Sequence, residues 1–185
     1  MKLVFLLEEK SMKRFLDIIL PKILPEGVLF QTIPHEGKND LEKSIPRKLK
    51  AWHEPDVKFI IIQDQDSWDC VKLKNKLIGL CKEANKTFLV RIACHELESW
   101  YFGDLQAVSK AYNKDLTKIA QKSQYKTPDK IVNPKNELLK FLPEHQQILG
   151  AKKIAEYFEP QINTSVSFQM LLSGIKKLIT NEEND

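Results

Sequence analysis

The stretch Lys58-Phe-Ile-Ile-Ile-Gln-Asp-Gln-Asp-Ser-Trp-Asp-Cys70 decides the fold of this chain. It opens with an apolar run, residues 59–62, in which apolar and polar residues do not alternate. Such a run is typical of a strand buried on both faces, as in a parallel sheet covered by helices. Three carboxylates follow it: Asp64, Asp66 and Asp69. Because α/β sheets bind ligands outside the carboxyl ends of their strands, the stretch predicts a site at the end of a central strand.

Strand and helix patterns alternate from the N-terminus to residue 104. We expect strands at 3–7, 28–33, 59–63 and 88–93, and helices at 11–20, 41–52, 71–83 and 97–101. Pro21 and Pro25 with Gly27 are expected to close the first of these units, and Pro46 to lie in the first turn of the second helix or to break it. Gly37, in the polar turn 35–40, is free to take a positive φ. This order predicts an α/β fold with a mainly parallel, doubly wound sheet and helices on both faces.

The pattern beyond residue 104 is helical. Helices are expected at 105–120 with an interruption at Asn113, and at 136–141, 151–158 and 168–180, with a loop at 123–134. Ser165 and Ser167 precede the last helix as N-cap residues, and residues 181–185 are expected to fray. We therefore expect one domain, residues 1–185, in which a C-terminal helical cap (105–185) covers one side of an α/β core (1–104).

Composition limits the class of protein. A chain of 185 residues with 42% hydrophobic and 29% charged residues has enough apolar mass for a globular core. No apolar run approaches the ~20 residues that span a bilayer, and no secretory signal is seen. Three cysteines without Cys-x-x-Cys spacing favour reduced thiols in a cytoplasmic protein over disulfides or a zinc site. The dispersed net charge of +4 permits nucleic acid as partner, but argues against a salt-sensitive grip on long duplex by this chain alone.

Acidic pairs follow three of the expected strands. They are Glu8 and Glu9 after the first, Asp64 and Asp66 after the third, and Glu96 and Glu98 after the fourth. Right-handed crossovers bring the carboxyl ends of parallel strands to one edge, so these acids are expected to converge. Mg²⁺ or Mn²⁺ with oxygen ligands would offset their repulsion, and a pair of such ions can drive phosphodiester hydrolysis. For any single pair, a solvated loop is the alternative interpretation.

The acids differ in the roles that their positions predict. Glu8 is expected to bind metal because it follows the first strand without an adjacent cation, and Asp64 and Asp66 because residues two apart in an extended backbone share one face. With two bound ions, these acids could also act in catalysis by activating water. Glu98 is the preferred ligand after the fourth strand. Asp69 and Glu96 are further candidates for metal ligands.

Each of the other charged residues has a structural explanation as well. Asp69 could instead complement the dipole of the helix that follows it. Glu96 shares a face with Glu98 only if the strand continues to both. Glu9 could be an acid behind the metal ligands or an exposed neighbour of a helix start, and the second interpretation is preferred. Lys38 could reach a phosphate or stabilise developing negative charge as a catalytic residue, or it could be an ordinary loop lysine.

Five segments resemble, in order, the domain-of-unknown-function family 4276 (DUF4276). They are LLEEKSM (6–12), HEGKNDL (35–41), QDQDSWDCVKLK (63–74), RIACHELESWYFGD (91–104) and SVSFQ (165–169). That family is similar to the topoisomerase-primase (Toprim) fold, in which a Glu after the first strand and Asp-x-Asp after the third bind Mg²⁺. The resemblance implies these roles for Glu8, Asp64 and Asp66, and for Glu98 that of the additional acid of nuclease branches. It also implies an ABC- or AAA-type ATPase partner, because relatives often occur beside such ATPases in bacterial defence loci.

Two positions depart from these patterns. Glu9 stands where Toprim proteins commonly have Gly, and Gln147 stands where family members often carry Lys in a Tyr-x-Lys segment. If that Lys assists catalysis, the chain is slow or inactive. The sequence therefore predicts a Mg²⁺- or Mn²⁺-dependent nuclease acting on DNA or RNA, a phage-defence effector that works with an ATPase. The alternative is a non-catalytic module that binds a partner ATPase or nucleic acid, and homo-oligomer formation stays open.

Overall fold

A four-stranded parallel sheet lies at the centre of the computed structural model, which describes residues 1–180. The strands are β1 (Lys2–Leu7), β2 (Leu29–Pro34), β3 (Val57–Asp64) and β4 (Phe88–Ala93). Their order is β2-β1-β3-β4, and every neighbouring pair is parallel. The register sets Leu7 opposite Ile62, so β1 and β3 end beside each other at one edge of the sheet.

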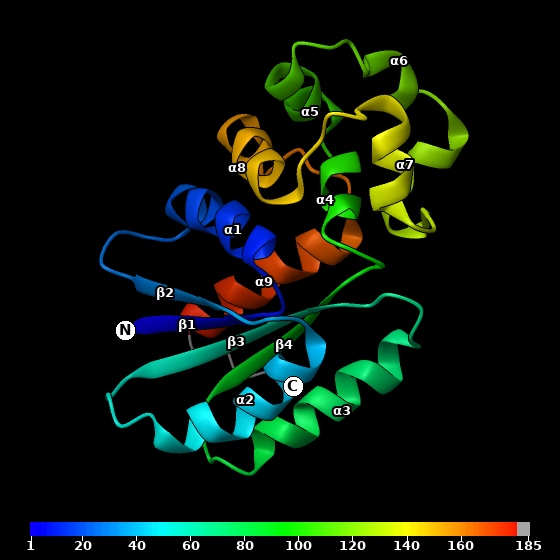
Figure 1. The fold of residues 1–185 in the computed structure, drawn as a ribbon. Coiled ribbons are helices and arrows are strands. Elements are labelled where there is room, and N and C mark those ends of the chain that lie inside the picture. The colour runs from blue at the N-terminus through cyan, green and yellow to red at the C-terminus, as the bar shows by residue number, and fades with distance from the viewer. Residues whose placement is uncertain (181–185) are drawn as a thin grey trace.

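Helices cover both faces of the sheet, as predicted. On one face lie α1 (Lys10–Ile23) and α9 (Val166–Thr180), and on the other lie α2 (Lys38–Ala51) and α3 (Cys70–Lys82) (Figure 1). The Lys76 ammonium of α3 lies 2.7 Å from each carboxylate oxygen of Glu42 in α2, which ties these two helices together. The expected α/β fold with a parallel sheet between helical layers is confirmed.

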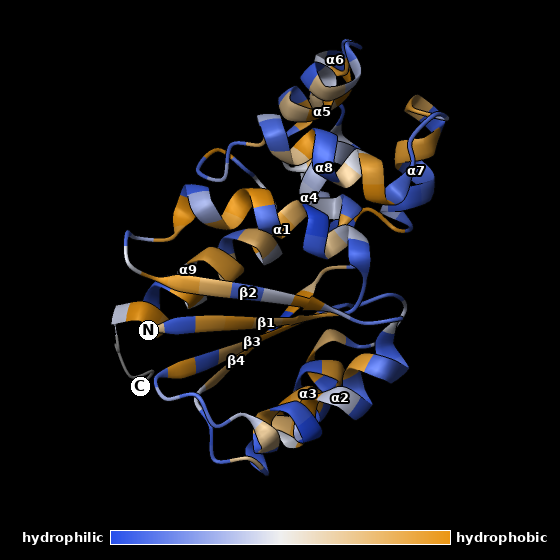
Figure 2. Cartoon of the chain, turned by 60° about the vertical axis from the view of Figure 1, so that its left-hand side comes forward, coloured by the Kyte–Doolittle hydropathy of each residue, from blue (hydrophilic) through white to orange (hydrophobic). Residues whose placement is uncertain are grey.

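Alternate residues of the central strands pack into two separate cores. In β1, Leu3, Phe5 and Leu7 face α1 and α9, whereas Val4 and Leu6 face α2 and α3. All five are fully buried, and Figure 2 shows the apolar residues that run along the strands. Since burial of one such side chain stabilises by about 1.5–3 kcal/mol, the register of the central strands is held firmly from both sides.

The remaining helices form a cap on the side of α1 and α9 (Figure 1). They are α4 (Glu98–Phe102), α5 (Leu105–Tyr112), α6 (Thr117–Ala120), α7 (Pro134–Phe141) and α8 (Gln147–Tyr157), with 3₁₀ turns η1 (Ser123–Tyr125) and η2 (Pro128–Lys130). α8 packs against α1 and α5. Phe158 meets Phe15 edge-on with 4.9 Å between ring centroids. The cap therefore shares one apolar core with this face of the sheet.

The ends of the cap helices follow the expected signals. Asn113 ends α5 with a φ of 48°. Ser165 Oγ accepts a hydrogen bond from the Phe168 N–H at 3.2 Å, which confirms it as a cap of α9. The expectation that residues 181–185 fray lies outside the described residues.

The prediction for Pro46 was wrong, and that for the end of α1 was wrong for Pro21 only, since α1 ends at Ile23, just before Pro25 and Gly27. Pro21 lies inside α1, and Pro46 lies well inside α2 without breaking it. A proline in a helix interior removes one hydrogen bond and costs about 3 kcal/mol or more. In α2, the buried residues Leu41, Ile45 and Leu49 recur at helical spacing, and their burial offsets that loss.

Two further expectations concern the cysteines and the membrane. Cys70, Cys81 and Cys94 are all free thiols, as predicted. Within residues 1–180, no helix combines the length and the apolar character needed to cross a bilayer.

Candidate functional site

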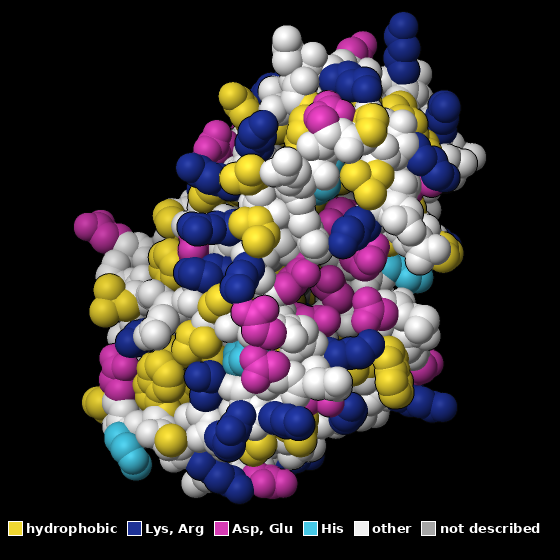
Figure 3. Space-filling view, viewed as in Figure 1, with side chains coloured by type: hydrophobic (Ala, Val, Ile, Leu, Met, Phe, Trp, Pro, Cys, Tyr) yellow, Lys and Arg dark blue, Asp and Glu magenta, His cyan; other side chains and the backbone are white. Residues whose placement is uncertain are grey.

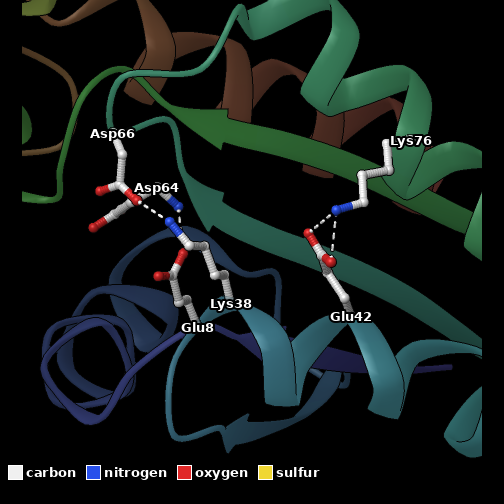
Figure 4. Close-up of polar contacts among 6 residues, drawn as sticks. All are labelled: Glu8, Lys38, Glu42, Asp64, Asp66 and Lys76. Carbon is white, nitrogen blue, oxygen red and sulfur yellow. Dashed lines mark hydrogen bonds and ion pairs between the residues drawn. The ribbon is translucent and has the colours of Figure 1, made fainter.

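Glu8 and Asp64 meet where the two central strands end. Glu8 follows β1 directly, and Asp64 is the last residue of the neighbouring strand β3. The backbone N–H of Asp64 donates a hydrogen bond to Glu8 Oε2 at 3.1 Å (Figure 4). The Asp64 side chain is buried, and its Oδ1 has no hydrogen-bond partner. The parallel topology thus brings together two residues that lie far apart in the sequence.

Asp66 and Lys38 form an ion pair beside this contact (Figure 4). Gly37 takes a φ of 93°, as predicted, and α2 begins at Lys38 rather than at residue 41. Lys38 is therefore the first residue of a helix rather than part of the turn, and its Nζ lies 3.2 Å from Asp66 Oδ2. The two side chains are 42% and 38% exposed, so their pairing contributes at most about 1 kcal/mol. A stronger cation could therefore displace Lys38.

Glu98, in α4, is a third acid at this edge of the sheet, and its charge acts on Asp64. The chain leaves β4 through a turn in which His95 has a φ of 59°, so the strand does not continue to Glu96 and Glu98. Glu98 becomes the first residue of α4 and is 1% exposed, and neither of its carboxylate oxygens has a hydrogen-bond partner. Trp100 and Tyr101 of the same helix are buried too. An unpaired buried carboxylate is strongly unfavourable, which makes Glu98 a group that needs a proton or a cation.

Burial raises the proton affinity of the acids at this edge. It raises the pKa of Glu8 to about 7; the charges of Asp66 and Glu9 add to this effect, while the hydrogen bond from the Asp64 N–H opposes it. It also raises the pKa of Asp64 well above its usual value, with further contributions from the charges of Glu8, Glu9 and Glu98. The acids therefore act on one another as one electrostatic cluster.

Glu98 belongs to the same cluster. Burial raises the pKa of its carboxyl group to about 7, and the charges of Glu96 and Glu9 add to this effect. The charge of Lys135 lowers it, but less than burial raises it. We use the name acidic edge for Glu8, Glu9, Asp64, Asp66 and Glu98.

Glu9 is a member of this edge, although the sequence favoured an exposed position beside a helix start. It occupies the N-cap position of α1, but its side chain makes no capping hydrogen bond. Instead, Gln147 Nε2 donates to its two oxygens at 3.1 and 3.0 Å, and the Ser11 hydroxyl donates to it as well. The only sequence signal for this role is its position next to Glu8.

Lys135 joins the site from α7. Its ammonium donates to Gln147 Oε1 at 3.2 Å, and its backbone N–H donates to Glu96 Oε2 at 3.0 Å. Gln147, where the family resemblance leads one to expect lysine, thus links a lysine from elsewhere in the cap to Glu9. No sequence pattern points to Lys135.

Two acids predicted as metal ligands instead accept hydrogen bonds from backbone N–H groups at the starts of helices. Asp69 is the N-cap of α3, where its Oδ1 accepts from the Lys72 N–H at 2.8 Å. Glu96 holds the first turn of α7 through the backbone of Lys135. Both contacts are structural, because each satisfies a backbone donor in the first turn of a helix.

The acidic edge is not a closed set of metal ligands in this arrangement. Within residues 1–180, no three Asp, Glu, His or Cys side chains converge closely enough to hold an ion together. The reason lies in two contacts: Glu8 turns to the Asp64 N–H, and Asp66 turns to Lys38. The donor set nevertheless suits a hard divalent cation, because it consists of carboxylate oxygens and includes unpaired ones on Asp64 and Glu98.

The acidic edge borders a hollow on the surface. Acidic side chains gather around it in the middle of the face seen in Figure 3. A cavity of about 350 Å³ is lined by two residues of the acidic edge, Glu8 and Glu9, and by His35, Gly37 and Gln147, among others. A separate groove of about 340 Å³ follows the outer edge of β4 between α3 and α9, and no residue of the acidic edge lines it.

Comparisons with known proteins give a family. Neither a search of curated proteins nor a search of solved structures finds a match to this chain. The family described as "Domain of unknown function (DUF4276)" matches residues 7–176, which include every residue of the acidic edge. The match covers nearly the whole chain, and the protein therefore belongs to the DUF4276 family.

Proposed function

We propose that this protein is a Mg²⁺- or Mn²⁺-dependent enzyme that hydrolyses phosphodiester bonds in DNA or RNA. One observation carries the proposal: Glu8, Asp64 and Glu98 are acids of raised pKa at one edge of the sheet, and three of their oxygens are unpaired. A divalent cation would remove both the mutual repulsion and the unpaired oxygens in a single binding event. Divalent ions held by carboxylates also bind phosphate oxygens well, which suggests a phosphodiester as substrate.

The residues of the acidic edge and Lys38 would have different roles in this reaction. Glu8, Asp64, Asp66 and Glu98 would hold the metal. When bound, the ion lowers the pKa of a water molecule and stabilises negative charge on the phosphate and the leaving oxygen. Glu8 has a pKa of about 7, which suits a group that accepts a proton at neutral pH. Lys38, once released from Asp66, is free to contact a phosphate oxygen.

The layout also supports the proposed relation to Toprim proteins. Glu8 and the Asp64-Gln65-Asp66 segment follow adjacent parallel strands, which is the arrangement that the Toprim pattern requires. Through the same relation we propose an ABC- or AAA-type ATPase as partner, a role in bacterial phage defence and a cytoplasmic location.

A non-catalytic binding module is the second candidate. It is favoured by Gln147, which replaces a lysine of the family pattern, and by the ligand set that is not closed in this arrangement of residues 1–180. In this alternative the acids persist as part of a surface that binds an ATPase or nucleic acid.

Two measurements separate these candidates. Thermal unfolding with increasing Mn²⁺ should reveal stabilisation of the native protein that is absent in Asp64→Asn/Asp66→Asn, a variant of nearly the same shape with two charges fewer. Labelled single-stranded and duplex DNA and RNA should be cleaved in Mn²⁺ by the native protein alone. Binding of metal without cleavage of any substrate, with the candidate ATPases present, would favour the module. Absence of metal binding would reject the enzyme.

A further inference from the structure

The cap carries an excess of positive charge that the core does not share. Residues 105–185 contain twelve lysines and nine acidic residues, whereas residues 1–104 contain seventeen basic and sixteen acidic residues. Within the cap, the excess lies in residues 113–130, which contain five lysines and two acidic residues. Most of the chain's net charge of +4 therefore comes from residues 105–185.

Five lysines of the cap recur at every fourth position. They are Lys114, Lys118, Lys122, Lys126 and Lys130, and we call them the lysine rim. All five are exposed. They follow the outer path of the chain from the end of α5 through α6 and η1 to η2 (Figure 1). None of them forms an ion pair with a carboxylate of residues 1–180.

The acids within the rim do not neutralise it. Residues 113–130 contain two, Asp115 and Asp129. Asp115 accepts hydrogen bonds from the backbone and hydroxyl of Thr117 at 2.9 and 2.5 Å. Asp129 accepts from the hydroxyls of Ser165 and Ser167 at 2.8 Å each, and from the Ser167 N–H at 3.0 Å. Both carboxylates serve local structure, so the positive charge of the rim remains available to an outside polyanion.

The rim ends in a part of the cap that packs against α4. η2, which ends at Lys130, packs against α4, the helix that begins with Glu98. Five residues further on, Lys135 donates its backbone N–H to Glu96 and its ammonium to Gln147, the partner of Glu9. The chain thus runs from the last lysine of the rim to Lys135, whose ammonium binds the glutamine that contacts Glu9.

We propose that the lysine rim binds the phosphate backbone of a single nucleic-acid strand and directs it to the acidic edge, an inference that rests on the proposed function. Lysine and uncharged polar side chains are the usual contacts of phosphate groups and need no base sequence. The residues between the lysines supply such groups, all exposed: Asn113, Gln121, Ser123, Gln124 and Thr127. An anionic membrane would instead call for large apolar side chains beside the lysines, and none is exposed within residues 113–130.

Binding of a labelled single-stranded oligonucleotide, measured by fluorescence anisotropy in EDTA, tests this inference without cleavage. The rim variant is Lys118→Gln/Lys122→Gln/Lys126→Gln. Its matched control, Lys48→Gln/Lys82→Gln/Lys86→Gln, removes three charges at the opposite edge, where the strands begin. Each lost phosphate contact should reduce the slope of log K against log salt by about 0.7, so the rim variant should lose about two units. The control should keep the slope of the native protein.

Equal slopes in the rim variant and the native protein, or equal losses in both variants, would overturn the inference. Protection of the rim lysines from acetylation by the same oligonucleotide, read by mass spectrometry, gives a second test on the unaltered chain. Rim-dependent binding to phosphatidylserine vesicles with no binding of the oligonucleotide would overturn it in favour of a membrane. The Asp64→Asn/Asp66→Asn variant should still bind the oligonucleotide. If the native protein binds the oligonucleotide through the rim but never cleaves it, the proposed function is contradicted, whereas the inference that the rim binds nucleic acid is supported.

Discussion

The backbone N–H of Asp64 donates a hydrogen bond of 3.1 Å to the carboxylate of Glu8, and this contact joins the ends of the two central strands. It favours the ionised form of Glu8, yet burial outweighs it and raises the pKa of that group to about 7. The metal-free acidic edge is therefore held in an unfavourable electrostatic state near neutral pH, and several measurable consequences follow from that state.

The stability of the metal-free protein should fall as pH rises from about 4.5 to about 7 through the contribution of Glu98. Its pKa is about 7 in the folded state against 4.5 ordinarily, so the folded state binds the proton more tightly than the unfolded state does. The stabilising contribution is complete below pH 4.5 and is lost as pH rises through 7. The difference amounts to roughly 3 kcal/mol for a fully buried group.

Urea unfolding in EDTA at pH 5 and pH 8 measures this contribution. The control is Glu98→Gln, which keeps the shape and removes the titration. Its free energy of unfolding should exceed that of the native protein at pH 8 and approach it at pH 5. An identical pH dependence in both proteins would show that Glu98 does not titrate in this range.

Mn²⁺ should stabilise the native protein more at pH 8 than at pH 6, because metal and protons compete for the same carboxylates. At a hundredfold excess of free ion over its Kd, linkage gives about 2.7 kcal/mol of stabilisation. Thermal unfolding at the two pH values, with Ca²⁺ and with Asp64→Asn/Asp66→Asn as controls, provides the measurement. Stabilisation that is unaffected by the double substitution would place the ion elsewhere on the chain.

Replacing Lys38 by Gln should separate metal binding from cleavage. The ammonium of Lys38 holds Asp66 at 3.2 Å, so its removal frees a carboxylate and should lower the Kd for Mn²⁺ by several-fold, since the lost pair is worth up to about 1 kcal/mol. Cleavage should slow nonetheless, because the lysine no longer stabilises charge on the phosphate. Calorimetric titration and a cleavage assay test the two effects. Weaker metal binding in Lys38→Gln would contradict this role.

Gln147→Lys should increase cleavage. Gln147 Nε2 already lies 3.0 Å from a carboxylate oxygen of Glu9, so an ammonium group there would pair with that acid and add positive charge beside the acidic edge. The neighbouring residue offers a matched control, Gln146→Lys, with the same added charge outside the acidic edge. The measurement is the cleavage rate of each variant at the same Mn²⁺ concentration. An equal increase in both variants would contradict a specific role for residue 147, because the added charge would then act regardless of its position.

The secondary structure around the sheet follows closely from local sequence. The β4 strand at Phe88–Ala93 has the predicted bounds, and β1 and β3 differ from prediction by no more than two residues at each end. Apolar runs of this length favour buried strands over other local structures, and crossover connections then fix all carboxyl ends at one edge. The effect of Pro46 could not be predicted in this way, because it depends on how strongly Leu41, Ile45 and Leu49 are buried by a distant part of the chain.

The sequence by itself therefore determined the parallel sheet, its two helical layers and the proximity of Glu8 to Asp64. These features follow from the spacing of apolar residues and from the lengths of the connections between strands, and both depend on residues that are close together in the chain. Only the tertiary structure decided the burial of Glu98, the turn of Glu9 toward Gln147 and the arrival of Lys135 at the edge. These depend on where the cap docks, and the contact between Gln147 and Glu9 joins residues 138 positions apart. No local pattern encodes such a contact, because its free energy arises from side chains that meet only after the chain has folded.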